Sequence, residues 1–144
     1  MRLGAFSLGT SAESHPRTYL LIRMVNTALL PTLFRLKLHF DRARPNHLDP
    51  ALTTEIDAPA HPAYPSGHAA QAMLFAIVLS EVNPAAADAH FHDARRIAFN
   101  REVAGVHYQS DTVAGFELAR KFSALLADEP WYRMLVEHAA TEWP

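Results

Sequence analysis

The sequence of 144 residues contains no cysteine, which excludes disulfides and thiolate metal sites. Its formal net charge of -2 lacks the basic surplus that general nucleic-acid binding requires, so any cationic site must be local. Long apolar runs are also missing, because the stretches 19–36 and 69–82 are interrupted by arginine or fall short of the roughly 18 residues of a membrane span. We therefore expect no nucleic-acid partner and no transmembrane segment.

A hydrophobic content of 49% and a charged content of 19% indicate a globular domain with a substantial core. Residues 1–14 are small and polar, and one arginine with a glycine-interrupted apolar stretch makes a poor secretion signal. We predict a flexible N-terminal arm over 1–14 and a single domain over 15–144. The expected compartment is the cytoplasm, or the periplasm if a leader has been removed.

The segment 16–42 has the apolar spacing of an amphipathic helix. Pro31 either kinks this helix or starts a second one. Pro45 favours a helix end at Arg44, and the seven-residue separation of Lys37 and Arg44 puts both on one side if the helix persists that far. The predicted apolar stripe consists of Leu21, Met24, Val25 and Ala28.

The most apolar helix is predicted over 67–82. It follows residues 46–64, whose prolines and lack of periodicity predict a loop with at most one short turn, which we expect to form a pocket wall. Pro65 holds the preceding residue extended, and Ser66 is suited to cap the helix. The helix is apolar almost all round, which predicts a central position.

The dipeptide 83–84 ends this helix and starts the next, on which Arg101 falls on the apolar side. A guanidinium there is unfavourable unless an anion meets it, and the alternative is that it extends to solvent. Arg101 and His107 would point apart on a continuous helix, but a break at Gly105 could bring them together. His107 and Asp111 have the spacing of a carboxylate–imidazole pair if that stretch is helical.

Two further helices are predicted in the C-terminal third. Ser110 or Asp111 caps the first, and Asp128 with Pro130 opens the second, which runs to about Glu142. The predicted buried stripe of the first helix consists of Leu118, Phe122 and Leu125, and the second contains Trp131, with Trp143 after it. The two tryptophans are expected to pack the last helix or a contact with a second copy. No strand pattern competes, so the predicted fold is an all-α bundle of five or six helices.

The start of the 67–82 helix has the features of an anion site. The Ser66 hydroxyl can accept from the first free amides, and Gly67 lets a ligand approach the backbone closely. The remaining amides and the helix dipole favour negative charge, with His68 at the mouth. The alternative is an ordinary capped helix with a surface histidine.

Three short motifs follow one another along the chain. They are Lys37-x6-Arg44-Pro45, Pro65-Ser66-Gly67-His68 and Arg101-x5-His107-x3-Asp111. In this order they resemble the three-part signature of the type-2 phosphatidic acid phosphatase and vanadium haloperoxidase superfamily, and in particular its soluble acid-phosphatase-like branch. The resemblance covers residues 37–111, about half of the chain, and agrees with an all-α bundle.

The resemblance implies a phosphatase that hydrolyses phosphate monoesters through a phosphohistidine. His107 would be the nucleophile, held by Asp111, and His68 would protonate the leaving oxygen and later activate water. The phosphate oxygens would be bound by Lys37, Arg44, Ser66, Gly67 and Arg101. Three fixed cations can neutralise the transferring group as Mg²⁺ does elsewhere, so we expect no metal and no cofactor. The expected substrate is a small phosphomonoester or a diffusible lipid phosphate.

Two other functions remain open. Vanadate mimics phosphate, so the same pocket could serve a vanadium-dependent haloperoxidase, although the halogenating relatives are much larger. Asn100 stands where the family usually has serine, and the N-terminal part is short beside soluble relatives; both features motivate a phosphate-binding protein without turnover. A second subunit could supply a missing pocket wall, so a homodimer is a further expectation.

The other histidines carry weaker signals. His90, His92 and Asp93 lack a completing metal ligand, and on a helix the two histidines face different ways, so we interpret them as solvated surface. His39 and His61 could line the pocket because they are close in sequence to its predicted residues.

Overall fold

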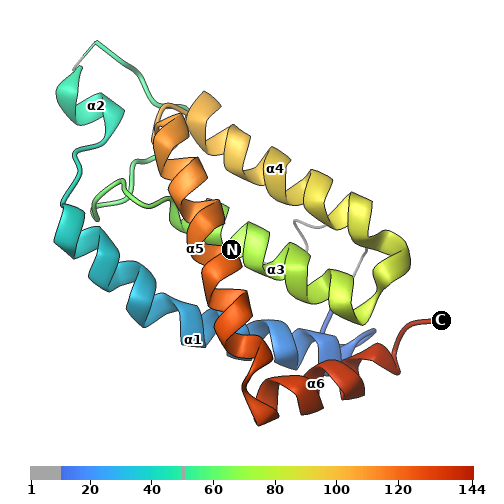
Figure 1. Cartoon of the computed structure of the whole chain (residues 1–144). Helices are drawn as coiled ribbons and strands as arrows, with labels where there is room; N and C mark the ends of the chain where they lie inside the picture. Colours follow the sequence, from blue (N-terminus) through green and yellow to red (C-terminus); the bar gives the residue numbers. More distant parts are fainter. Residues whose placement is uncertain (1–10, 50) are drawn as a thin grey trace.

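The computed structural model describes residues 11–49 and 51–144, so most of the predicted N-terminal arm lies outside the described residues. Every regular element in this part of the chain is helical (Figure 1), which confirms the all-α prediction. The elements are α1 (Pro16–Phe40), α2 (Pro45–Leu48), α3 (Gly67–Val82), a short 3₁₀ turn η2 (Pro84–Ala86), α4 (Ala87–Val103), α5 (Gln109–Ala127) and α6 (Pro130–Ala140).

Helix α3 is the centre of the bundle, as its apolar sequence predicted. It packs most extensively against α4 and α5, and also contacts α1 and α6 (Figure 1). Ser66 is its N-cap and accepts a hydrogen bond from the Ala69 amide, and the helix ends at Asn83. Because α3 is covered on several sides, a functional group at its N-terminus is held by the most deeply buried element of the fold.

Helix α1 runs through Pro31 as one element, so the alternative of a second helix beginning there is wrong. It ends at Phe40, because Asp41 adopts a left-handed conformation with φ of 41°. Arg44 therefore does not lie on this helix and instead caps α2 in an extended conformation. Lys37 and Arg44 are consequently brought together by a change of chain direction and not by helical spacing. In the predicted stripe, Met24 is exposed.

The start of α5 differs from the prediction. The N-cap is Tyr108, and Asp111 is the third residue of the helix, where its carboxylate accepts a hydrogen bond from the Tyr108 amide at 3.0 Å. Leu125 was predicted to be buried but is exposed, and Leu126 takes the buried position instead. A one-residue error of this kind follows from extending a stripe over several turns, because helical period is not an integer.

Close packing fixes α5 against the start of α3. A Cβ added to Gly115 would lie 2.7 Å from the Ser66 carbonyl oxygen and 2.9 Å from the Ala69 Cβ. Only glycine allows the two backbones to approach this closely. The same contact holds the N-terminal turn of α3 beside the second turn of α5. No helix of the described residues is long and apolar enough to cross a bilayer.

Candidate active site

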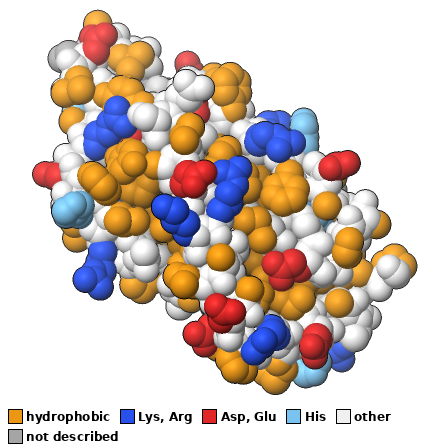
Figure 2. All heavy atoms as spheres, viewed as in Figure 1, with side chains coloured by type: hydrophobic (Ala, Val, Ile, Leu, Met, Phe, Trp, Pro, Cys, Tyr) orange, Lys and Arg blue, Asp and Glu red, His pale blue; other side chains and the backbone are white. Residues whose placement is uncertain are grey.

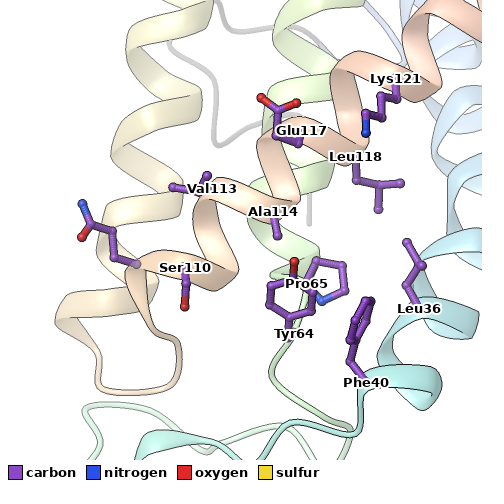
Figure 3. Close-up of a pocket in the computed structure, with 11 residues that line it drawn as sticks. Leu36, Phe40, Tyr64, Pro65, Ser110, Val113, Ala114, Glu117, Leu118 and Lys121 are labelled. Atoms are coloured by element: carbon purple, nitrogen blue, oxygen red, sulfur yellow. The ribbon is translucent and has the colours of Figure 1, made fainter.

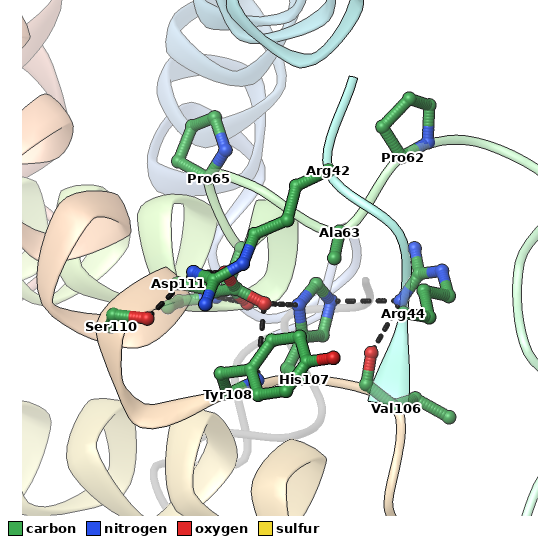
Figure 4. A network of polar contacts seen from close by, with 12 residues as sticks. Arg42, Arg44, Pro62, Ala63, Pro65, Val106, His107, Tyr108, Ser110 and Asp111 are labelled. Atoms are coloured by element: carbon green, nitrogen blue, oxygen red, sulfur yellow. Dashed lines mark hydrogen bonds and ion pairs between the residues drawn. The ribbon is translucent and has the colours of Figure 1, made fainter. Parts of the chain in front are cut away.

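His107 and Asp111 form the buried centre of a polar network between the starts of α3 and α5 (Figure 4). The His107 Nδ1 lies 3.0 Å from Asp111 Oδ2. His107 precedes α5, so the pair does not depend on the continuous helix that their spacing suggested. The same Asp111 oxygen accepts from the Tyr108 amide, which fixes the carboxylate relative to the ring. The Asp111 carbonyl accepts from the Ser66 amide at 2.9 Å and so connects the second and third motifs.

Arg42 completes this network and was missed in the sequence. Its Nη1 donates to Asp111 Oδ1 at 2.8 Å and to Ser110 Oγ at 2.6 Å. Its guanidinium also lies over the Tyr108 ring, 4.3 Å from the ring centroid. The available signal was the Arg42-Ala43-Arg44 pattern, because residues two apart on an extended chain point to the same side.

Arg44 is fully buried and lies on the other side of the His107 ring. Its Nη1 donates to the Val106 carbonyl at 2.7 Å and lies 3.3 Å from His107 Nε2. Its Nε donates to the Pro59 and His61 carbonyls, so the 46–64 loop is wrapped around the guanidinium. Burial lowers the pKa of Arg44, and the nearby charge of Arg101 lowers it further. The ring nitrogen that Asp111 does not hold thus faces a positive charge.

Lys37 is buried beneath the loop that leads into α3. Its ammonium group donates to the carbonyl oxygens of Pro62 at 2.9 Å, Ala63 at 3.1 Å and Pro65 at 2.7 Å. Burial and the charge of Arg44 lower the pKa of Lys37 to about 8. All three N–H groups are engaged by backbone, so a contact with a phosphate oxygen would require one of them to be exchanged.

Arg101 approaches the same region from the last turn of α4. The chain can turn back from α4 because Gly105 adopts a φ of 72°, which provides the break expected there. The Arg101 Nε is buried and has no hydrogen-bond partner among the described residues. Burial lowers the pKa of Arg101, and its charge in turn lowers the pKa of Arg44 and His68. A buried guanidinium nitrogen without a partner is a strong indication that an anion belongs beside it.

His68 lies half-buried on the first turn of α3, and within the described residues its side chain makes no hydrogen bond. Burial lowers the pKa of His68 to about 4, and the charges of Arg101, His107 and His61 contribute in the same direction. Burial likewise lowers the pKa of His107, against the opposing hydrogen bond from Asp111. Both rings are therefore neutral at pH 7. Arrival of an anion between them and Arg101 would raise both pKa values.

Burial by itself raises the pKa of Asp111, but the contacts with His107, Tyr108 and Arg42 outweigh this effect and lower it. The carboxylate is therefore ionised, and its charge is balanced by Arg42 on one oxygen and by the His107 N–H on the other. With Nδ1 donating to Asp111, the neutral His107 ring carries its lone pair on Nε2.

The remaining histidines divide into three cases. His61 lines the site, since its Nδ1 lies 3.2 Å from Arg44 Nη2. His39 is exposed and packs against Phe40, so it does not line the site. The prediction that His90 and Asp93 are solvated is wrong, because both are buried on α4. Helical spacing indicated the buried side, because His90 and Asp93 lie four residues before Ala94 and Ile97, but the prediction rested on the polarity of the two residues.

A groove of about 710 Å³ lies beside this network, between the C-terminal half of α1 and the first turns of α5 (Figure 3). Its walls include Leu36 and Phe40 on one side and Val113 and Leu118 on the other. It borders the site through residues adjacent to Ser66 and Asp111, but none of the predicted site residues lines it. The groove is therefore a neighbouring surface and not the anion site itself.

Residues 17–134 match the PAP2 superfamily. The chain belongs to the PAP2 superfamily. The three motifs that resemble the family signature lie inside the matched range, and the network described above is built from them. A non-specific acid phosphatase of Providencia stuartii is 34% identical over 80 residues, which are 56% of this chain and 32% of that protein. The chain thus spans about a third of the length of this curated relative.

The fold of this PAP2 superfamily member also resembles a solved structure. A transmembrane PAP2-type phosphatidylglycerolphosphate phosphatase from Bacillus subtilis superposes with a TM-score of 0.56 and 22% sequence identity. The superposition covers 74% of this chain and 55% of the bacterial enzyme. At this identity the likeness establishes a common helical fold.

Proposed function

We propose that the protein hydrolyses phosphate monoesters by transferring the phosphoryl group to His107. The observation that carries this proposal is the orientation of the His107 ring, whose Nδ1 is held by Asp111 at 3.0 Å while Nε2 faces Arg44 at 3.3 Å. Nε2 thereby carries the lone pair of the ring and accepts a hydrogen bond from the buried Arg44, which an attack on phosphorus would displace. The acid phosphatase relative and membership of the PAP2 superfamily support the same chemistry.

In the first step, the Nε2 lone pair attacks phosphorus and the bond from phosphorus to the ester oxygen breaks. His68 gives its proton to that oxygen, which leaves as an alcohol. In the second step, neutral His68 removes a proton from water as the water oxygen attacks the phosphohistidine, and inorganic phosphate leaves. The second step restores both rings to their starting states.

Charge neutralisation would come from the chain's own side chains. Phosphoryl transfer depends mainly on positioning and on stabilising charge that spreads over the phosphate oxygens. Arg44 and Arg101 would bind these oxygens, with Lys37, Ser66 and the Gly67 amide as further donors. Arrival of the dianion would satisfy the buried Arg101 Nε, and it would raise the pKa of His68 toward a value at which that ring can act as an acid.

The substrate is proposed to be a small phosphomonoester or a diffusible lipid phosphate. The relative from Providencia stuartii is described as non-specific. The cations Arg44 and Lys37 lie near His107, and cations can recognise the phosphate while making few demands on the rest of the molecule. Broad specificity is therefore the expectation.

The test is hydrolysis of a chromogenic aryl phosphate by the wild-type chain and by His107→Ala, each with and without a chelator. Wild-type turnover should survive the chelator, and His107→Ala should lose about 10⁴-fold or more in rate because it removes the nucleophile. His92→Ala, which changes an exposed histidine on α4, is the matched control and should retain full activity. Turnover that disappears with the chelator would contradict the metal-independent route. No turnover by a folded wild type would favour vanadate-dependent oxidation, tested with peroxide, halide and vanadate, or phosphate binding alone.

A further inference from the structure

The outer face of α1, which points away from the core, carries exposed apolar side chains near both ends of the helix. Leu21, Val25 and Leu29 are buried on the inner face. On the opposite face the exposed fractions are 49% for Leu20, 40% for Met24, 42% for Phe34 and 71% for Leu38. A helix on the surface of a globular protein normally presents polar side chains to water there. Figure 2 shows hydrophobic side chains interspersed with charged and histidine side chains along the edge of the molecule where α1 lies in Figure 1.

The charged side chains of α1 itself are all positive. Arg23 and Arg35 flank the outer face on its two sides, both are exposed, and neither forms an ion pair within the described residues. The 25 residues of α1 contain no aspartate or glutamate. An apolar face bordered by arginines without carboxylates has the charge pattern of a helix that lies in a lipid–water interface.

A groove continues the face toward α6. It has a volume of about 480 Å³ and is lined by Leu20, Met24, Arg23 and Trp131, together with small residues of α1. Tryptophan is favoured at the boundary between acyl chains and headgroups because its ring is apolar and its N–H is polar. The groove thus combines an apolar wall, an interfacial aromatic residue and a cation at its rim.

We propose that the outer face of α1, formed by Leu20, Met24, Phe34 and Leu38 and flanked by Arg23 and Arg35, docks on the surface of a bilayer that contains anionic lipids. The apolar side chains would enter the interfacial region, and the two arginines would contact the headgroups. The docking does not depend on the proposed hydrolysis. It would hold the end of α1 that carries Lys37 at the lipid boundary.

A second copy of the chain fits this surface less well. In a twofold contact the same face meets itself, so arginines approach arginines. The outer face of α1 has no carboxylate that could separate them, whereas an anionic lipid surface supplies the missing negative charge. Charge complementarity therefore favours the lipid.

The experiment is co-sedimentation of the full chain with vesicles of phosphatidylcholine alone and of phosphatidylcholine mixed with phosphatidylserine, at low and high salt. Binding should require phosphatidylserine and weaken as salt increases, and the tryptophan emission should shift to shorter wavelength. The double variant Phe34→Gln/Leu38→Gln should bind at least about tenfold more weakly. Arg23→Gln and Arg35→Gln should each weaken binding about fivefold.

The controls are Phe99→Gln and Arg95→Gln, which change an exposed apolar residue and an exposed arginine on α4. Both should bind the mixed vesicles as the wild type does, and circular dichroism should show that all variants are folded. The proposal is overturned if the wild type does not bind the mixed vesicles, or if the α1 and α4 variants weaken binding equally. It is also overturned if sedimentation velocity shows that the wild type is a dimer, that Leu38→Gln dissociates this dimer, and that the dimer does not bind vesicles.

Discussion

The candidate site has two parts, the Asp111 side of the His107 ring and the region around Arg101 and His68, and the two are built in different ways. On the Asp111 side, both carboxylate oxygens have partners, supplied by Arg42, His107 and the Tyr108 amide. On the Arg101 side, a buried guanidinium nitrogen has no partner among the described residues. The first side is complete without a ligand and the second is not. Residues of the first side should therefore matter for both stability and activity, and Arg101 for activity alone.

Replacement of His68 by alanine is expected to cause the largest loss after that of His107. Removal of a general acid and base typically costs about 10²- to 10⁴-fold in rate. The loss should be larger for an alkyl phosphate than for an aryl phosphate, because a poor leaving group needs the proton more. Comparison of kcat for the two substrates measures this difference. Equal losses for both would show that His68 does not protonate the leaving oxygen.

Arg101→Gln should reduce kcat/KM by about 10²- to 10³-fold, since it removes a donor aimed at developing charge. The same change should leave the melting temperature unchanged or raise it, because the buried Nε that it removes has no hydrogen-bond partner among the described residues. Thermal unfolding without ligand measures the second effect. A clear fall in melting temperature would mean that Arg101 has a structural partner, and the contrast between the two sides would fail.

The pH dependence tests the lowered pKa values on the open side. The proposed first step needs His68 protonated, and its pKa is lowered to about 4, so kcat/KM should rise by up to tenfold per unit as pH falls from about 6.5 toward 5. Ionisation of the substrate affects the wild type and His68→Ala equally, so the variant is the control. Its pH profile should lack this rise. A wild-type profile that is flat or increases from pH 5 to pH 8 would contradict the assignment.

Stability should change with pH in the opposite sense to activity. Folding lowers the pKa of His68 and His107 below the ordinary value for histidine. At pH values between the lowered and the ordinary pKa, the unfolded chain therefore binds more protons than the folded chain. The stabilisation is complete above about pH 6.5 and is lost as pH falls toward the lowered values. Melting temperatures measured at each assay pH separate this loss from the kinetic effect.

Arg42→Gln should have the smallest effect on rate and should also lower stability. The change leaves Asp111 Oδ1 without its cationic partner. The resulting loss of stability is moderate because the Arg42 side chain is 37% exposed and water screens the pair. We expect about a tenfold fall in kcat and about 1 kcal/mol of destabilisation. Arg120→Gln, which breaks an exposed pair with Glu117, is the matched control and should change neither quantity. If both variants behave alike, Arg42 does not position Asp111.

Local features of the sequence were sufficient to predict several parts of the fold. The apolar composition of 67–82 and the capping serine before it predicted α3 and its central place, because both are properties of neighbouring residues. The spacing of His107 and Asp111 indicated a pair, and Gly105 indicated the turn that precedes it. The C-terminal end of α1 was harder to predict, because Asp41 adopts a left-handed conformation that the neighbouring residues did not indicate.

The sequence by itself determined the helical class, the central helix and the set of cations and histidines from which a phosphate site could be made. Only the tertiary structure decided how they are used. It showed that Arg42 holds Asp111, that Lys37 is engaged by three carbonyls of the preceding loop, and that His90 is buried. The physical reason is that each of these depends on contacts between segments far apart in the chain, whereas periodicity and capping report only on residues within a few turns of one another.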